Sequence, residues 1–393
     1  MAVEETHLST GLGEIVLSRQ SRSHSRKEQN LRPWDAADEL MLAYLTKQAP
    51  IPGKRFLIVN DQYGALTVSI AKALPENPVY SAGDSYLSQQ ATRKNLAVNN
   101  CDEESINWLT SLDRMEGEVD YLLIKLPKLL ALLEDQLHRY RPACKPETRV
   151  VAAGMVKYMP ARVFKLFEGI LGPTHTSLAK KKARLIFSKP QSSDKTTVTP
   201  RLVSYRLENT TYQIDNHANV FSRESLDIGT RFLLENLPDF ETFPCKGGTT
   251  EINIADLGCG NGIVGLIAAE KCPWASIDFY DESFMALESA RLNFNRAFPG
   301  KKTRFIADDC MSGAPAGHYD VILCNPPFHQ NNVVGDFIAQ QMFRDARKAL
   351  QLGGELRVVA NRHLDYFHSL KRLFGNCRII STNRKFVILK VIK

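Results

Sequence analysis

The sequence predicts an α/β fold made of two tandem Rossmann-like domains, and three observations lead to this prediction. Segments typical of strands alternate with helical segments from about residue 55 to 170, and again from residue 201 onward, as in sheets covered by helices. The chain has 393 residues, which is enough for two domains of ordinary size. The two halves also carry similar segments in the same order.

The first half starts with a polar stretch, residues 1–33, which is rich in Ser and Arg and is expected to be partly extended. WDAADELMLAYL then predicts an amphipathic helix with Asp35 as its N-cap. Four segments have the β-branched and aromatic content of strands, namely RFLIVN, PVYSAG, VDYLLIKL and TRVVAAG. Helices are expected between them in LSQQATRKNLAVN and LLALLEDQLHRY, an alternation that favours a parallel sheet.

The second half follows a stretch rich in Ser, Thr, Pro and Lys, residues 188–200, which we interpret as part of a linker. The predicted domains are therefore 1–195 and 201–393. A helix is expected first, in RESLDIGTRFLLENL. Strands are expected after it in EINIADLGCG, ASIDFYDES, TRFIADD, YDVILCNPP, GELRVVAN and KFVILKVI.

The similarity between the halves indicates an internal duplication. VYSAGDSYLSQQATRKNLAVN resembles IDFYDESFMALESARLNFN, and VDYLLIKLPK resembles YDVILCNPPF. Any two doubly wound domains share a rhythm of strands and helices, but here polar residues match in order, such as Asp84 with Asp281. Two stretches differ, because DLGCGNG stands opposite NDQYGAL and NPPF stands opposite KLPK. Chemistry that depends on these stretches belongs to the second copy alone.

Composition narrows the function classes. The net charge is +7, and the first 200 residues carry most of the excess, which permits a polyanionic partner without requiring one. The eight cysteines form no CxxC pair and have no His cluster beside them, so we expect no metal site and no disulfide framework. The chain has no run of 18 apolar residues and no apolar stretch near its start. We therefore expect a cytoplasmic protein that does not span a membrane.

A strand, a glycine-rich loop and a helix follow one another in IADLGCGNGIVGLIAAE, residues 254–270. Gly258, Gly260 and Gly262 allow positive φ angles and a close approach of the backbone to a ligand. The pattern is D-x-G-x-G-x-G and differs from the G-x-G-x-x-G of dinucleotide folds. Asp256, which opens the loop, would repel a pyrophosphate and suits a cationic ligand such as S-adenosylmethionine, with its ammonium and sulfonium groups.

Acidic residues end the next two strands. Asp281 can accept two hydrogen bonds from a ribose diol, and either Asp281 or Ser283 can cap the following helix, two roles that can coexist. The third strand ends in IADDC, where Asp308 or Asp309 could accept a hydrogen bond from the exocyclic amine of adenine. We favour Asp309 for this contact and expect Asp308 to be an exposed loop acid.

NPPF, residues 325–328, comes at the carboxyl end of the fourth strand, where open α/β sheets bind ligands. The two prolines remove two backbone donors and restrict the chain. The Asn325 amide oxygen and the Pro326 carbonyl can accept N–H bonds from an aromatic exocyclic amine and so direct its lone pair at a methyl group. Pro327 stiffens the turn, and Phe328 offers a flat face on which a base can stack.

The set DLGCGNG, YDES and NPPFHQ resembles the class I S-adenosylmethionine-dependent methyltransferases that modify exocyclic amines. NPPF followed by His, with HANVFSRESLDIGTRFLL upstream, is similar to the ribosomal RNA guanine-N2 methyltransferases, and the resemblance covers nearly the whole chain. It implies a degenerate N-terminal methyltransferase domain and a catalytic C-terminal one. Within the family the fit is nearer to members that modify 23S rRNA than to those that modify 16S rRNA.

The resemblance implies a role for each motif residue. The cofactor would be S-adenosyl-L-methionine, held by Asp256, Gly258, Gly260, Gly262 and Asp281, with Asp309 as our choice for adenine. Catalysis would depend on Asn325, Pro326, Pro327 and Phe328. The partner would be 23S rRNA, either naked or in a partly assembled large subunit, and a monomer is expected.

Some assignments stay open at this point. The basic stretch LAKKKARLIF, residues 178–187, could contact RNA or form a solvated face. Phe221, Ser222 and Asp227 could line the cofactor pocket or serve the structure only. The alternatives to a 23S rRNA enzyme are the 16S rRNA enzyme, a glutamine methyltransferase, a DNA adenine methyltransferase and a non-catalytic RNA-binding assembly factor. DNA is disfavoured as a partner because no target-recognition insert follows NPPF.

Overall fold

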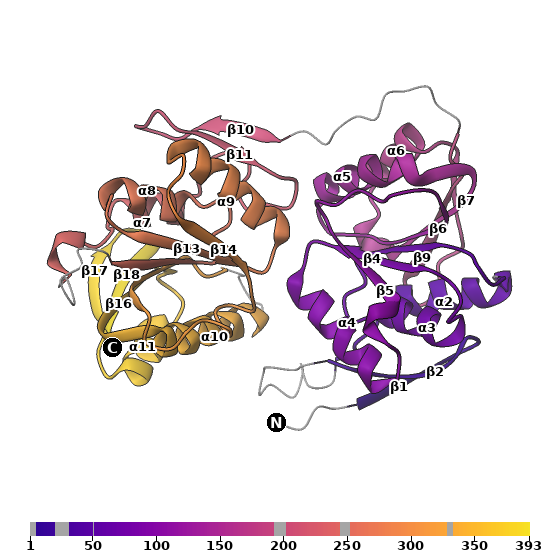
Figure 1. Ribbon diagram of the computed structural model, residues 1–393, viewed down its shortest axis with the longest axis horizontal. Coiled ribbons are helices and arrows are strands. Elements are labelled where there is room, and N and C mark those ends of the chain that lie inside the picture. The colour runs from indigo at the N-terminus through magenta and orange to yellow at the C-terminus, as the bar shows by residue number, and fades with distance from the viewer. Residues whose placement is uncertain (1–4, 20–30, 50, 192–201, 244–251, 328–332) are drawn as a thin grey trace. The chain divides into compact units, whose positions relative to one another are not determined.

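The computed structural model describes residues 5–19, 31–49, 51–191, 202–243, 252–327 and 333–393, with residues 333–336 described by their backbone alone. The chain divides into two compact units, Met1–Arg201 and Leu202–Lys393. Each unit contains a seven-stranded sheet that is covered by helices on both faces (Figure 1).

The first unit opens with a hairpin that the polar composition of residues 1–33 did not predict, β1 (Glu5–Thr10) and β2 (Gly13–Ser18). The strands of its large sheet are β3 (Phe56–Val59), β4 (Val79–Gly83), β5 (Ile106–Thr110), β6 (Val119–Lys125), β7 (Cys144–Met155), β8 (Thr174–Thr176) and β9 (Ala183–Ser188). Its α-helices are α2 (Ala36–Gln48), α3 (Ala65–Ala73), α4 (Tyr86–Val98), α5 (Leu130–Tyr140) and α6 (Ala161–Ile170).

The second unit repeats this plan. It also opens with a hairpin, β10 (Val203–Arg206) and β11 (Gln213–Asn216). The strands of its large sheet are β12 (Asn253–Leu257), β13 (Ser276–Asp281), β14 (Thr303–Ala307), β15 (Tyr319–Cys324), β16 (Leu350–Asn361), β17 (Arg378–Thr382) and β18 (Phe386–Ile392). Its α-helices are α7 (Ile228–Leu234), α8 (Ile263–Lys271), α9 (Phe284–Ala297), α10 (Val333–Ala349) and α11 (Tyr366–Phe374).

The two large sheets have the same topology. Their strand orders are β5-β4-β3-β6-β7-β9-β8 and β14-β13-β12-β15-β16-β18-β17. The first five strands of each sheet are parallel, as the alternation of strands and helices predicted. The prediction is wrong for β18, which is antiparallel to both of its neighbours. The same holds for its counterpart β9, which was not among the predicted strands. The short connections β8–β9 and β17–β18 contain no crossover helix, and a parallel pair would need one.

The duplication extends to individual contacts. In the first unit, Asn95 on α4 accepts a hydrogen bond from the backbone N–H of Ser18 on β2, at 2.9 Å. In the second unit, Asn293 on α9 accepts one from the backbone N–H of Asp215 on β11, at 2.8 Å. Both asparagines are buried. The same residue type therefore fastens the opening hairpin to the same helix in each copy, which supports descent of both halves from one domain.

Local signals explain several boundaries. Asp35 caps α2 as predicted, and its carboxylate accepts hydrogen bonds from the backbone N–H groups of Ala37 and Asp38 in a capping box. The helix expected from residue 223 begins instead at Ile228, because Asp227 is its N-cap. Ser188, where the predicted linker begins, is the last residue of β9, and residues 192–201 lie outside the described residues.

Alternating side chains of the central strands pack on opposite faces of each sheet. In β3, Phe56 and Ile58 join the core under α2, α3 and α4, whereas Leu57 and Val59 join the core under α5 and α6 (Figure 1). The second sheet is covered in the same way, by α7, α8 and α9 on one face and by α10 and α11 on the other. Because helices cover both faces, the carboxyl ends of the strands are where a sheet of this kind usually carries its site.

Candidate functional site

The carboxyl ends of β12, β13, β14 and β15 meet at one edge of the second sheet. Leu257 pairs with Tyr280 on one side and with Cys324 on the other, and Asp281 pairs with Ala307. The glycine loop, Asp281, the acids at 308–309 and Asn325 follow directly after these positions. The structure thus brings together every predicted site residue except Phe328, which lies outside the described residues.

The glycine loop lies against this edge. Gly258, Gly260 and Gly262 have φ angles of 72°, 54° and 78°, in the left-handed region that favours glycine. The N–H of Gly258 donates to the carbonyl of Tyr280 at 2.9 Å. A Cβ atom on Gly258 would come within 4.0 Å of the carbonyl oxygen of Asn325. The loop and the NPPF motif are therefore neighbours. The space beside Gly260, where an added Cβ would meet nothing within 4 Å, is open to a ligand.

Asp256 supports the loop from the interior. Only 2% of this residue is exposed, and its carboxyl accepts the N–H of Gly265 in α8 at 2.8 Å. Burial raises the pKa of Asp256 to about 8, and the nearby Asp281 adds to the rise. The sequence argument relied on a charged Asp256 that attracts a cation, whereas burial favours the neutral form of this carboxyl. A direct contact of Asp256 with a cofactor stays a prediction.

Asp281 links the loop to the next helix. One carboxylate oxygen accepts the N–H of Gly260 at 2.9 Å, and the other accepts the N–H of Ser283 at 3.0 Å. Ser283, and not Asp281, is the N-cap of α9, since its hydroxyl accepts the N–H of Ala286. Asp281 is half-buried at the strand end. Each carboxylate oxygen can accept more than one hydrogen bond, so Asp281 could also accept hydrogen bonds from the two hydroxyls of a ribose.

The two acids after β14 differ in their surroundings. Asp308 was expected to be exposed, and this is wrong, because only 6% of it is exposed. Its carboxylate accepts hydrogen bonds from the N–H of Asp309, the hydroxyl of Ser312 and the N–H of Gly313, at 2.7–2.8 Å. Asp308 therefore holds a turn together. Asp309 is half-buried at the same edge and remains the candidate for the adenine contact.

The Asn325 amide is held in one orientation. Its nitrogen donates to the hydroxyl of Thr230 at 2.9 Å, and Thr230 belongs to α7. Its oxygen is buried and has no hydrogen-bond partner in the part of the chain that the structure describes. A buried acceptor without a partner is costly unless a ligand supplies the donor. Thr230 was missed in the sequence, although the spacing D-x-x-T at a helix start is a recognisable signal.

Cys324 precedes the motif and could suggest a nucleophile. It is fully buried in the core beside α10, and burial raises the pKa of its thiol well above the usual value. A neutral thiol directed into the core cannot attack a base at the sheet edge. The site is thus suited to positioning an amine, and Cys324 is not placed to act as a covalent nucleophile.

The first unit has lost the equivalent loop. Gly64 caps α3 as Gly262 caps α8, which shifts the match between the loops by two residues relative to the sequence comparison. Asn60 then corresponds to Gly258, and it shares the positive φ, at 65°. Gln62 corresponds to Gly260. Only one of the three glycines is retained, and larger side chains occupy the other two positions.

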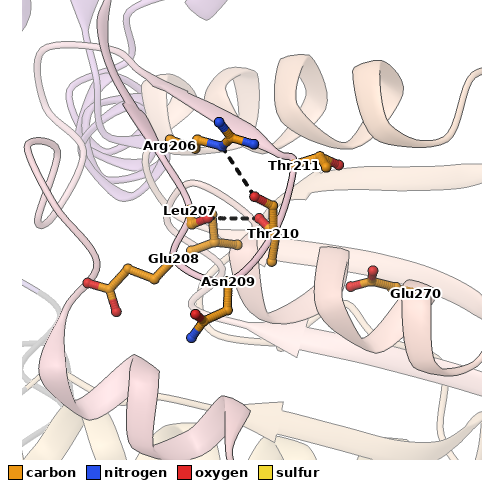
Figure 2. A pocket seen from close by; sticks show the side chains of 7 residues that line it. All are labelled: Arg206, Leu207, Glu208, Asn209, Thr210, Thr211 and Glu270. Atoms are coloured by element: carbon orange, nitrogen blue, oxygen red, sulfur yellow. Dashed lines mark hydrogen bonds between the residues drawn. The ribbon is translucent and has the colours of Figure 1, made fainter.

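A surface hollow lies elsewhere in the second unit. Figure 2 shows that it is lined by the β10–β11 turn, residues 206–211, and by Glu270. The Arg206 side chain donates to the carbonyl of Thr210 at 3.3 Å, and the Thr210 hydroxyl donates to the carbonyl of Leu207 at 2.9 Å (Figure 2). Glu270 is at the C-terminal end of α8, whereas the glycine loop is at its N-terminal end. The hollow is therefore not part of the candidate site.

The described residues contain no group of three or more His, Cys, Asp or Glu side chains that could hold a metal ion. Within the same ranges, no helix has both the length and the apolar character to cross a membrane.

Comparisons with known proteins find a matching family for each half of the chain. Residues 5–192 match the family model of the RLMG N-terminal domain, and residues 211–390 match that of the methyltransferase small domain. A solved structure of the T. thermophilus 16S rRNA N2 methyltransferase, in complex with AdoMet and guanosine, aligns with a TM-score of 0.74. The alignment covers 99% of this chain and 98% of that one at 20% identity. The predicted fold of two tandem methyltransferase-like domains is thereby confirmed.

The ribosomal RNA large subunit methyltransferase G of Erwinia tasmaniensis is 48% identical over 373 residues, which is 94% of each chain. This similarity confirms the resemblance that the motifs indicated. Together with the matched domains, it shows that the chain belongs to the family of ribosomal RNA large subunit methyltransferase G.

Proposed function

We propose that this protein transfers the methyl group of S-adenosyl-L-methionine to the exocyclic N2 amine of a guanine in 23S rRNA. The observation that carries the proposal is the buried side-chain oxygen of Asn325, which has no partner among the described residues. The backbone carbonyl of the same residue lies next to Gly258 of the glycine loop. The side-chain oxygen suits an amine donor. The Erwinia relative, named as a large-subunit enzyme, supports the choice of RNA.

In the second unit, we assign cofactor binding and catalysis to different residues. The loop with Gly258, Gly260 and Gly262 would hold the cofactor together with Asp281 and Asp309, and Asp256 would keep the loop in shape from below. The bound cofactor supplies an electrophilic methyl group. The Asn325 oxygen and the Pro326 carbonyl would accept the two amine protons of guanine, which localises the nitrogen lone pair. Phe328 would stack on the base, and the base would first have to leave its RNA stack.

We infer that the first unit binds RNA at the carboxyl edge of its own sheet. The loops after β6 and β7 and the turn between β8 and β9 meet there, because Val156 donates to the carbonyl of Lys182 at 2.9 Å. Five lysines belong to these loops, namely Lys128, Lys157, Lys180, Lys181 and Lys182. Residues 151–200 carry nine Lys and Arg side chains against two acidic ones. Such a cluster can bind phosphates without reading sequence.

Tyr158 adds an aromatic face to this edge. The ammonium groups of Lys157 and Lys128 lie 4.7 and 5.9 Å from the centre of its ring. The residue is 36% exposed, and a hydrogen bond from Lys157 lowers the pKa of Tyr158. An exposed ring flanked by cations is a platform on which an unpaired base can stack.

We propose domains of 1–195 for RNA binding and 201–393 for catalysis, in a monomer that acts in the cytosol.

Reversing the charge of this edge should weaken RNA binding. We expect the double variant Lys128→Glu and Lys157→Glu to bind a 23S rRNA fragment about 10- to 100-fold less tightly at moderate salt, with a shallower salt dependence. The matched control reverses Lys47 and Lys94, which are exposed lysines on α2 and α4. Fluorescence anisotropy at several salt concentrations measures both. Equal losses in the two double variants would reject the interface.

The proposed reaction has a direct cellular test. Nucleosides from purified 23S and 16S rRNA are quantified by mass spectrometry, in cells with and without the gene for this protein. We expect N2-methylguanosine to decrease in 23S rRNA alone. Loss from 16S rRNA alone would point to the small-subunit reaction. No change in either RNA would exclude ribosomal RNA methylation and favour a non-catalytic assembly factor or another substrate.

A further inference from the structure

We propose that Thr230 is a positioning residue, which, with Asp227, turns the Asn325 amide so that its oxygen faces the substrate amine. This inference deepens the proposed methylation and rests on it. An asparagine amide carries an acceptor at one end and two donors at the other, so that only one of its two orientations can accept an amine proton. The residue that selects the orientation therefore positions the catalytic amide.

The direction of the hydrogen bonds follows from the partners. Asp227 is the N-cap of α7, and its carboxylate accepts the backbone N–H of Thr230 at 2.8 Å. The same carboxylate oxygen lies 3.3 Å from the Thr230 hydroxyl. A carboxylate can only accept, so the hydroxyl proton is directed toward Asp227. The hydroxyl oxygen then accepts from the Asn325 nitrogen, at 2.9 Å. The Asn325 oxygen is left at the other end, buried and without a partner among the described residues.

The duplicated first unit provides an independent comparison. There Asp35 caps α2, and Asp38 follows it at the spacing at which Thr230 follows Asp227. Lys125 ends β6 where Asn325 follows β15, and its ammonium lies 2.8 Å from Asp35 and 2.6 Å from Asp38. The third residue of the helix thus holds the side chain at the strand end in both copies. Because this contact is kept in two copies that have otherwise diverged, it belongs to the common plan of the two domains.

The contact of Lys125 with Asp38 in the first unit is ionic, whereas that of Asn325 with Thr230 in the second unit is between neutral groups. Lys125 is only 13% exposed, and its ammonium offers donors but no acceptor. Burial raises the pKa of Asp38 to about 6, against the opposing effect of Lys125. The first unit therefore fills this position with an ion pair. The second unit places a neutral hydroxyl there, which leaves an amide oxygen available for a substrate.

The test compares Thr230→Val, which removes the hydroxyl and keeps the shape, with Thr230→Ser, which keeps the hydroxyl. The Val variant should have a kcat lower by roughly 10- to 100-fold, because a loosened group at the reacting centre costs this much, with KM values for cofactor and RNA unchanged. The Ser variant should stay within about threefold of wild type, since it retains the same acceptor. A normal kcat in the Val variant, or equal losses in both variants, would overturn the proposal.

A matched control separates positioning from stability. Thr148 in the first unit is buried, whereas Thr230 is half-buried, and the Thr148 hydroxyl donates to the carbonyl of Val119 at 2.6 Å. Thr148→Val should lose stability as Thr230→Val does but keep its kcat. If kcat falls equally in both Val variants, the effect is structural and the proposal fails. Should Thr230→Val not fold, Thr230→Ala takes its place against Thr230→Ser under the same criteria.

A second measurement does not depend on activity. In the full-length chain with ¹⁵N-labelled asparagine, the Asn325 side-chain NH₂ should exchange slowly in wild type and Thr230→Ser and faster in Thr230→Val. Equal exchange rates in the wild type and both variants would overturn the proposal that Thr230 sets the orientation of the amide. If the wild type methylates no rRNA while exchange follows the expected pattern, the proposed function fails and the orientation of the amide stands.

Discussion

Replacing Asn325 by alanine should lower kcat by about 10²- to 10³-fold, the cost of removing one preorganised hydrogen-bonding group from a polar active site. The buried amide oxygen has no partner among the described residues and is therefore available to the substrate amine, and alanine leaves only the Pro326 carbonyl of the two proposed acceptors. The nitrogen of a base amine is a poor nucleophile while its lone pair is delocalised into the ring. Alanine cannot localise that lone pair, and the reaction then proceeds without the acceptor.

Binding should survive this change. The cofactor loop keeps its own contacts with Tyr280 and Asp281, and the proposed RNA-binding edge belongs to the first unit. Single-turnover methylation of a 23S rRNA fragment, with separate titrations of cofactor and RNA, measures each quantity. Asn253→Ala is the matched control, because Asn253 begins β12 at the opposite edge of the same sheet. Normal turnover in Asn325→Ala would reject the assigned role.

Gly262→Ala should lower the free energy of unfolding of the second unit by about 3 kcal/mol, from left-handed backbone strain together with overpacking. An added Cβ would lie 2.7 Å from the Cβ and 2.9 Å from the Cα of Ala290. The second contact is with the backbone of α9, so helices α8 and α9 would have to move apart. The φ angle of 78° adds its own strain. Cofactor binding should be lost with the loop geometry.

Gly260→Ala is the control for this prediction. Its φ angle of 54° is also left-handed, but an added Cβ meets nothing within 4 Å. We expect a loss of about 1 kcal/mol from backbone strain alone. Its main effect should be weaker cofactor binding, since the methyl group would stand in the open space above the loop. Urea unfolding and calorimetric cofactor titration measure the two variants. Equal destabilisation would show that helix packing is not the cause.

The sequence alone determined the features that depend on nearby residues. Periodicity predicts the strands and helices, the glycine spacing predicts the loop at 258–262, and Asp35 predicts the start of α2. The prolines after Asn325 mark the end of a strand. These signals are local because a cap, a turn or an alternation involves residues within a few positions of one another. The matching order of motifs also indicated the two copies of one topology.

The tertiary structure decided the features that depend on distant partners. The orientation of Asn325 rests on Thr230, which is 95 positions away in the chain. The raised pKa of Asp256 comes from its burial, and Asp308 is buried by a turn that its own carboxylate organises. The antiparallel ends of both sheets follow from strand pairing. A single sequence gives no measure of burial or of long-range pairing, and these set the charge and direction of polar groups in the site.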